Sequence, residues 1–204
     1  MIEIIEGADD AAVAEWLHGR LAAALARSEA PVAITVPGGS TPFPILERLV
    51  AMPLAWRRLF VWPGDDRDVP EDHPASNTGK IRALFEPAGA EVVALSLMEQ
   101  APHFALTWLG MGADGHIASL CPNTDPRADD PLRLRTITPD PLPPEAPYAR
   151  ITLTIPALLD ADELVFVIRG AEKRALFEAA ARGESDLPVA RLLGAAHQPV
   201  TCFA

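Results

Sequence analysis

The segment that decides the fold covers residues 32–42 and reads VAITVPGGSTP. Val32–Val36 is a short, nearly continuous apolar run, which is typical of a strand buried on both faces of a parallel sheet. The two glycines that follow allow a sharp turn and a close approach of the backbone to a ligand. Thr41 and Pro42 suit the cap and the first position of a helix, which we expect to extend to about Val50.

The same order of strand and helix recurs along the 204 residues. Apolar patterning predicts strands at residues 2–5, 59–62, 91–95, 104–109, 150–154 and 164–168, helices at about 9–25, 78–85 and 172–181, and a last edge strand at 199–203. This alternation indicates a three-layer α/β/α domain with a mainly parallel sheet. At this length we expect one domain, residues 1–204.

Composition and charge exclude several classes of partner. The formal net charge is −11, from 17 basic and 28 acidic residues, and no basic run offers a docking stripe for nucleic acid. No apolar run approaches the ~20 residues that cross a bilayer, and residues 1–6 carry acid where a signal peptide carries base. We therefore expect a cytoplasmic protein with no nucleic-acid or membrane partner, in which Cys121 and Cys202 are ordinary reduced thiols.

The proline-rich stretch at residues 122–147 has little apolar periodicity and several aspartates. The strands on either side of it are too few to build two cores, so it is not predicted to be a domain linker. We interpret it as a long surface excursion near the functional site, with a partly disordered loop as the alternative.

The first segment that carries chemistry is the turn Gly38, Gly39, Ser40 and Thr41. It places free backbone amides and two hydroxyl groups at the start of a helix, an arrangement that attracts phosphate. An ordinary strand-to-helix turn has the same composition, and no P-loop lysine follows.

The second segment reads PGDDRDVP at residues 63–70 and continues to Ser76 and Asn77. It follows a predicted strand, and the carboxyl ends of parallel strands face the ligand crevice. Asp65 is suited to proton transfer there, and Arg67 to neutralising a phosphate. A solvated acidic loop is the alternative.

The third segment, LGMGADGH at residues 109–116, matches the dinucleotide fingerprint G-x-G-x-x-G. That motif requires a long helix after the third glycine, and Pro122 ends any helix after a few residues. The glycines instead present Asp114 and His116 at a strand end, where a neutral imidazole takes a proton from water near pH 7. The other histidines, His18, His73, His103 and His197, are interpreted as structural.

Nothing in the sequence predicts a covalent or metal mechanism. No G-x-S-x-G elbow, H-E-x-x-H motif or cysteine cluster occurs. The chemistry indicated is direct attack by water on a reactive ester, with no cofactor and no metal.

Together the three segments resemble the 6-phosphogluconolactonase family. Residues 38–42 resemble its G-G-S-T-P loop, residues 65–77 its D-E-R-x-V-P…S-N stretch, and residues 109–120 its L-G-M-G-x-D-G-H-T-A-S-L-F-P block. Residues 150–154, 170–173 and 187–189 are similar to its R-I-T-L-T, G-x-x-K and L-P-V motifs. The motifs occur in family order from about residue 32 to the end.

The resemblance implies a modified Rossmann fold and hydrolysis of 6-phospho-D-glucono-1,5-lactone to 6-phospho-D-gluconate in the oxidative pentose phosphate pathway. It implies that His116 is the general base and that Asp65 acts at the carbon-1 end. The predicted substrate- or phosphate-binding residues are Gly38, Gly39, Ser40, Thr41, Arg67, Asn77, Asp114, Arg150 and Lys173. The implied partner is the phosphorylated sugar lactone, and we expect a monomer or weak homo-oligomer.

Two departures from the family pattern stand out. Only residues 96–103 connect two predicted strands that the family joins through a helix, so one face of the sheet is expected to be covered differently. Asp66 replaces the glutamate of the family motif, which shortens the carboxylate side chain by one methylene. If Asp66 orients Arg67, we expect the substrate to be bound less tightly. A sugar-phosphate isomerase or deaminase, and a non-catalytic sugar-phosphate sensor, remain alternative functions.

Overall fold

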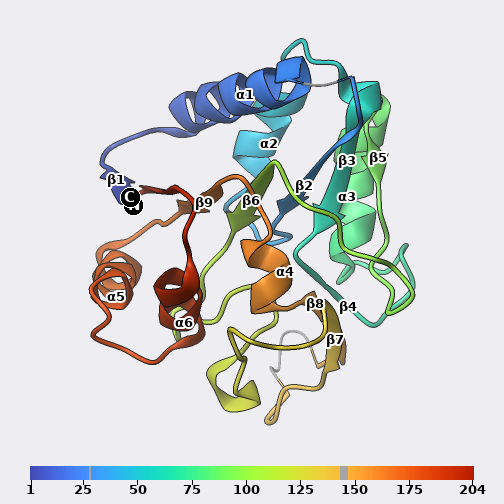
Figure 1. Ribbon diagram of the computed structural model, residues 1–204. Helices are drawn as coiled ribbons and strands as arrows, with labels where there is room; N and C mark the ends of the chain where they lie inside the picture. The colour runs from blue at the N-terminus through green and yellow to red at the C-terminus, as the bar shows by residue number, and fades with distance from the viewer. Residues whose placement is uncertain (28, 143–146) are drawn as a thin grey trace.

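The computed structural model describes residues 1–27, 29–142 and 147–204, and its centre is a parallel sheet of seven strands (Figure 1). The strand order is β1-β10-β9-β6-β2-β3-β5. The strands are β1 (Ile2–Ile5), β2 (Val32–Val36), β3 (Leu59–Pro63), β5 (Glu91–Val92), β6 (Leu106–Leu109), β9 (Leu164–Val167) and β10 (Val200–Phe203). Each neighbouring pair is parallel, so all carboxyl ends meet at one edge.

Helices cover both faces of this sheet. The helices α1 (Asp10–Arg27), α2 (Phe43–Val50) and α3 (Asn77–Phe85) pack on one face, and α4 (Ile155–Leu159), α5 (Ala171–Ala181) and α6 (Pro188–Ala195) on the other (Figure 1). Along β9, Val165 and Val167 belong to the first core, and Leu164 and Phe166 to the second. A strand buried on both faces needs apolar residues at every position, which confirms the three-layer prediction.

A second, antiparallel sheet of three strands lies beside the main one. It consists of β4 (Asp65–Arg67), β8 (Arg150–Leu153) and β7 (Leu134–Ile137), in the order β4-β8-β7. The predicted strand at residues 150–154 therefore exists but does not join the parallel sheet. The acidic loop after β3 is itself a strand, because the chain turns at Gly64 and pairs with β8.

Two other expectations need correction, and one helix was missed. The last strand, β10, is not an edge strand, because it lies between β1 and β9 and leaves β1 at the edge. The strand expected at residues 91–95 is limited to Glu91–Val92, and the helix α6 was not predicted. The proline-rich stretch contains the short 3-10 helix η3 (Pro122–Thr124) and β7, and its residues 143–146 lie outside the described residues. Two further 3-10 helices are η1 (Trp56–Arg58) and η2 (Glu86–Ala88).

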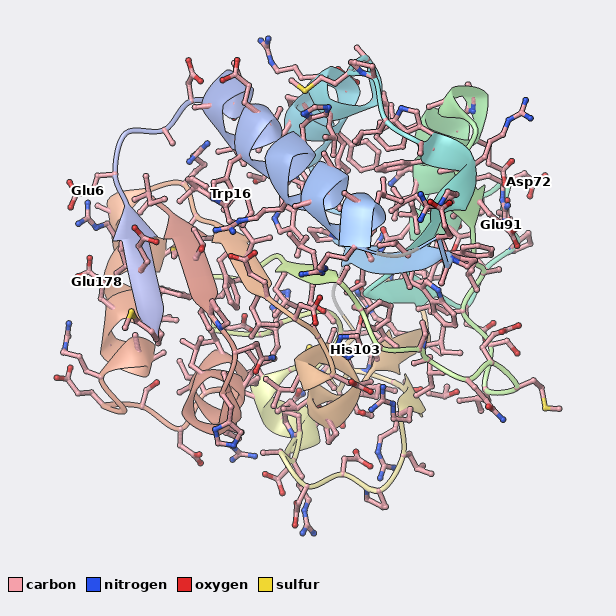
Figure 2. All side chains as sticks on the ribbon, turned by 45° about the horizontal axis from the view of Figure 1, so that its top comes forward. Glu6, Trp16, Asp72, Glu91, His103 and Glu178 are labelled. Atoms are coloured by element: carbon pink, nitrogen blue, oxygen red, sulfur yellow. The ribbon has the colours of Figure 1, made fainter. Side chains whose placement is uncertain are left out.

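The short connection between β5 and β6 contains no helix over residues 93–105, and it turns at Leu97 and Met98, where the amide of Glu99 donates to the carbonyl of Ser96 at 3.0 Å. Leu97 and Met98 on it are 60% and 89% exposed. His103, labelled in Figure 2, links this connection to the segment before β9. Its Nδ1 lies 2.7 Å from a carboxylate oxygen of Asp160, and its Nε2 lies 2.9 Å from one of Asp162. In the described part of the chain, no helix combines the length and apolar character needed to cross a membrane.

Candidate active site

A cavity of about 310 Å³ opens at the carboxyl ends of the parallel strands. Residues that follow β2, β3, β6 and β9, which are neighbours in the sheet, line it together. Ligand crevices of open α/β sheets occur at this edge. The cavity is therefore the candidate site, and the sequence segments singled out above meet in it.

The turn after β2 forms one wall. Gly39, Ser40 and Thr41 are exposed and line the cavity. Thr41 does not cap α2 as predicted, because Pro42 is the N-cap residue and its carbonyl accepts from the amides of Ile45 and Leu46. The polar groups of residues 39–41 therefore face solvent rather than the helix.

Gly38 in the same turn has a strict packing role. A Cβ atom there would lie 2.1 Å from Cγ of Asn77, so no larger residue fits. Asn77 is buried and lines the cavity floor. Its Nδ2 donates to the backbone oxygen of Asp65 at 2.9 Å, whereas its Oδ1 is buried without a hydrogen-bond partner in the structure.

His116 lies on the loop after β6 and also lines the cavity. Its Nδ1 is 2.6 Å from Oδ1 of Asp114. Burial acts to raise the pKa of Asp114, but the charge and hydrogen bonds of His116 outweigh it and hold that pKa below its ordinary value. A carboxylate only accepts hydrogen bonds, so Nδ1 donates to it, and when the ring carries a single proton Nε2 is the basic nitrogen.

Asp65 is a buried carboxyl at the cavity wall. Ser119 donates a hydrogen bond to its Oδ2, and Asn77 Nδ2 lies 3.4 Å from its Oδ1. Burial raises the pKa of Asp65 above its ordinary value, although Ser119, Arg67 and Arg150 oppose the increase. A buried titratable group at a cavity is the usual mark of a functional carboxyl.

Asp66, the neighbour of Asp65, does not orient the Arg67 side chain. Its Oδ1 accepts from the backbone amides of Asn77 at 2.6 Å and Arg67 at 2.8 Å, and its Oδ2 from the amide of Thr78 at 2.9 Å. The guanidinium of Arg67 instead donates to the carbonyl of Ala75. Asp66 is therefore a structural residue that satisfies amides at the start of α3.

Cations surround the cavity although the chain is acidic overall. Arg67 and Arg150 face each other directly in the β4–β8 register, and both line the cavity. Like charges at directly opposed positions destabilise a sheet, so an anion beside this pair is favoured, and the buried carboxyl of Asp65 interacts with both arginines. Lys173, in the first turn of α5, lines the same cavity and donates from Nζ to the carbonyl of Met111 at 3.0 Å.

The structure thus brings almost all of the predicted site residues together. The predicted residues that line the cavity are Gly38, Gly39, Ser40, Thr41, Asp65, Arg67, Asn77, His116, Arg150 and Lys173. Asp114 does not line the cavity, and it contacts Nδ1 of His116. The other histidines, His18, His73, His103 and His197, lie outside the lining.

Two polar residues of the site were missed. Arg169 lines the cavity, and its position directly after a predicted strand was a usable signal. Ser119 contacts Asp65 across 54 positions of sequence, which no local pattern reveals. The described residues contain no group of three or more His, Cys, Asp or Glu side chains placed to hold a metal ion.

The fold and cavity define an α/β protein with a cationic cleft at the carboxyl edge of a parallel sheet. The chain belongs to the family of glucosamine-6-phosphate isomerases/6-phosphogluconolactonase, which matches it over residues 8–90 and 86–201. This finding confirms the resemblance inferred from the three motifs.

Relatives of known name are similar over most of their length. The chain is 35% identical to a 6-phosphogluconolactonase of Mesorhizobium japonicum, over 92% of this chain and 88% of that protein. It is 35% identical to one of Pseudomonas aeruginosa, over 90% and 86%. The crystal structure of 6-phosphogluconolactonase from Thermotoga maritima superposes with a TM-score of 0.82 at 22% identity, over 100% of this chain and 99% of that one, which shows a shared fold.

Proposed function

We propose that this protein hydrolyses 6-phospho-D-glucono-1,5-lactone to 6-phospho-D-gluconate, a step of the oxidative pentose phosphate pathway. The observation that carries the proposal is that His116 and the turn at residues 38–41 line one small cavity. Relatives over most of the chain are named 6-phosphogluconolactonase. The proposal assigns to this chain the reaction those names describe.

Substrate binding is assigned to the turn and the cations. The backbone amides of residues 38–41 and the charges of Arg67 and Lys173 hold the phosphate and the sugar. Arg150, which lies opposite Arg67 in the β4–β8 register, adds a further positive charge. Hydrogen bonds from charged donors to phosphate are roughly twice as strong as neutral ones, which compensates for the overall negative charge of the chain.

Catalysis is assigned to His116, with Asp114 holding its tautomer. Nε2 of the neutral ring removes a proton from water as the water oxygen bonds to carbon 1, and the carbonyl becomes an oxyanion. Positive groups of the cavity stabilise that oxyanion, an effect often worth several kcal/mol. The bond between carbon 1 and the ring oxygen then breaks, and protonated His116 returns its proton to the leaving oxygen.

The test follows loss of the lactone by NMR, with the unaided opening of the lactone subtracted. We expect His116→Ala to lower turnover roughly 10²- to 10⁴-fold, the usual range for a general base. His197→Ala is the matched control, because His197 is exposed and lies outside the cavity. Near-normal turnover in a folded His116→Ala protein would remove the mechanism.

A second candidate is a sugar-phosphate isomerase or deaminase reaction, which the family description also includes. Burial of Asp65 in the cavity favours it, since such enzymes move a proton between carbons with a carboxylate. Incorporation of solvent deuterium into glucosamine 6-phosphate, without accelerated lactone loss, would select this reaction.

The remaining assignments concern the setting of the reaction. We propose a single lactonase domain over residues 1–204 that acts in the cytoplasm, without cofactor or metal, as a monomer or weak homo-oligomer. Light scattering across a range of protein concentrations tests the oligomeric state. Full lactonase activity after dialysis against a strong chelator is the expected result for a metal-free reaction.

A further inference from the structure

Arg169 is a cation of the cavity that the proposed mechanism leaves without a role. It lies two residues after the end of β9 and directly precedes Gly170, the N-cap residue of α5. Its side chain lines the same cavity as Lys173 and His116. A charged side chain at the carboxyl end of a central parallel strand is placed to contact a ligand.

Arg169 makes a loose ion pair with Asp10. One guanidinium nitrogen lies 3.3 Å from Oδ1 of Asp10, and the two side chains are 37% and 38% exposed. Arg191 and Asp186 show the contrasting case, with two nitrogens on two carboxylate oxygens at 2.9 and 2.8 Å. A single long contact between half-exposed groups contributes little, about 0–1 kcal/mol. Arg169 can therefore leave Asp10 at small cost.

Asp10 does not depend on Arg169 for its own stability. It is the acidic residue in the first turn of α1, where the helix dipole favours a negative charge. The start of α1 is also held separately, because Oδ1 of Asp9 accepts from the amide of Ala12 at 2.8 Å. When Arg169 leaves Asp10, the carboxylate of Asp10 is therefore still partly exposed to solvent, and the start of α1 is still capped by Asp9.

We propose that Arg169 is a substrate-binding, specificity-determining residue whose guanidinium leaves Asp10 and binds the phosphoryl group of the ligand. The inference rests on the proposed function for the identity of that ligand. A phosphoryl group carries about −1.5 to −2 charge at pH 7, and Arg presents a planar fork of donors that matches its oxygens. Asp10 competes with the ligand for the same guanidinium.

The experiment measures binding of D-glucitol 6-phosphate by calorimetry. This probe carries a phosphoryl group, has no carboxylate and does not react, and D-glucitol serves as the uncharged comparison. We expect Arg169→Ala to weaken binding of the phosphorylated probe roughly ten-fold, as the loss of a charge-assisted hydrogen bond predicts. We expect Asp10→Asn to tighten binding by roughly two- to five-fold, because it removes the competitor.

The double variant separates competition from a general effect of charge. If Asp10 acts through Arg169, the Asp10→Asn gain disappears in the Arg169→Ala background. A gain that persists there, or binding by Arg169→Ala within two-fold of the unaltered protein, would overturn the inference. So would failure of the unaltered protein to bind the phosphorylated probe more tightly than D-glucitol.

Arg174→Gln is the matched control. Arg174 is on α5 like Lys173, but it pairs with Glu6 and, at 2.8 Å, with Glu178, both labelled in Figure 2, and it does not line the cavity. The control removes one positive charge near the site and is expected to leave probe affinity within two-fold. Thermal melts of each variant establish that loss of binding is not loss of folding.

The inference and the proposed function fail in different ways. If the unaltered protein binds the phosphorylated probe through Arg169 but does not accelerate lactone loss, the lactonase assignment fails and the inference stands. If lactone loss is accelerated and Arg169→Ala has an unchanged KM and probe affinity, the inference fails alone.

Discussion

Gly112 lies directly beneath the imidazole of His116. A Cβ atom on Gly112 would be 2.2 Å from both Cε1 and Nδ1 of that ring, and 2.6 Å from Oδ1 of Asp114. The glycine is therefore required by the packing of the base and its carboxylate partner. Its backbone conformation does not require glycine, because the φ angle of Gly112 is not positive.

We expect Gly112→Ala to lower lactone turnover roughly 10²-fold, because displacing a catalytic group by about 1 Å has that effect. Gly110→Ala is the comparison on the same loop, since its Cβ would meet Pro37 at an ordinary 3.5 Å. Turnover measured by NMR should fall far less in Gly110→Ala. Equal losses in the two variants would show that the loop as a whole is intolerant.

Asp65→Asn is expected to stabilise the protein. Burial raises the pKa of Asp65, so the folded state binds its proton more tightly than the unfolded state. Ionisation therefore lowers the free energy of unfolding as pH rises above the unfolded pKa. Each 1 kcal/mol recovered by the amide raises Tm by roughly 2–4 °C in a chain of this size.

The Tm difference between Asp65→Asn and the unaltered protein should grow as pH rises from about 4 to 7. Thermal melts at several pH values check this dependence. A variant that melts below the unaltered protein at neutral pH would show that the carboxylate is stabilised by Arg67 and Arg150 more than burial destabilises it.

Asp66→Ala is expected to act on stability rather than on substrate affinity. The buried carboxylate accepts three backbone amides and the hydroxyl of Ser76, and truncation leaves those donors unsatisfied. We expect the free energy of unfolding to fall by roughly 2–4 kcal/mol in urea titrations. Asp68→Ala, at an exposed position nearby, is expected to change it by less than about 0.5 kcal/mol.

His103 also makes stability fall as pH rises, but through a favourable interaction of its charged form rather than through a burial penalty. Hydrogen bonds to Asp160 and Asp162 raise the pKa of His103 above its ordinary value of 6.5. The stabilisation is therefore full below pH 6.5 and is lost as pH rises through the folded pKa. The side chain is half-exposed, so the effect is expected to stay below about 1 kcal/mol.

Thermal melts of His103→Gln and the unaltered protein, from about pH 5.5 to 9, test this prediction. The unaltered protein should be the more stable at low pH, and its advantage should shrink as pH rises. An advantage that does not vary with pH would assign the contribution of His103 to packing alone.

Local sequence patterns were enough to predict the layered fold and most of the residues that line the cavity. Apolar runs such as Val32–Val36 and the glycine-rich segments that follow them are local patterns, and each one specifies a strand end where chemistry is concentrated. Because parallel strands all end at the same edge, predicting the ends also predicted that the turn at residues 38–41, Arg67 and His116 meet.

The order of the strands and the pairing of side chains could not be predicted and are known from the three-dimensional fold. In the fold, β10 lies inside the parallel sheet, and residues 150–153 form a strand of the second sheet, in which Arg150 is opposite Arg67. The carboxylate of Asp66 accepts hydrogen bonds from backbone amides at the start of α3. Ser119 donates a hydrogen bond to Asp65, and Arg169 donates one to Asp10. These contacts join residues far apart in the chain, and their energies depend on distance, burial and competing partners that a local pattern does not contain.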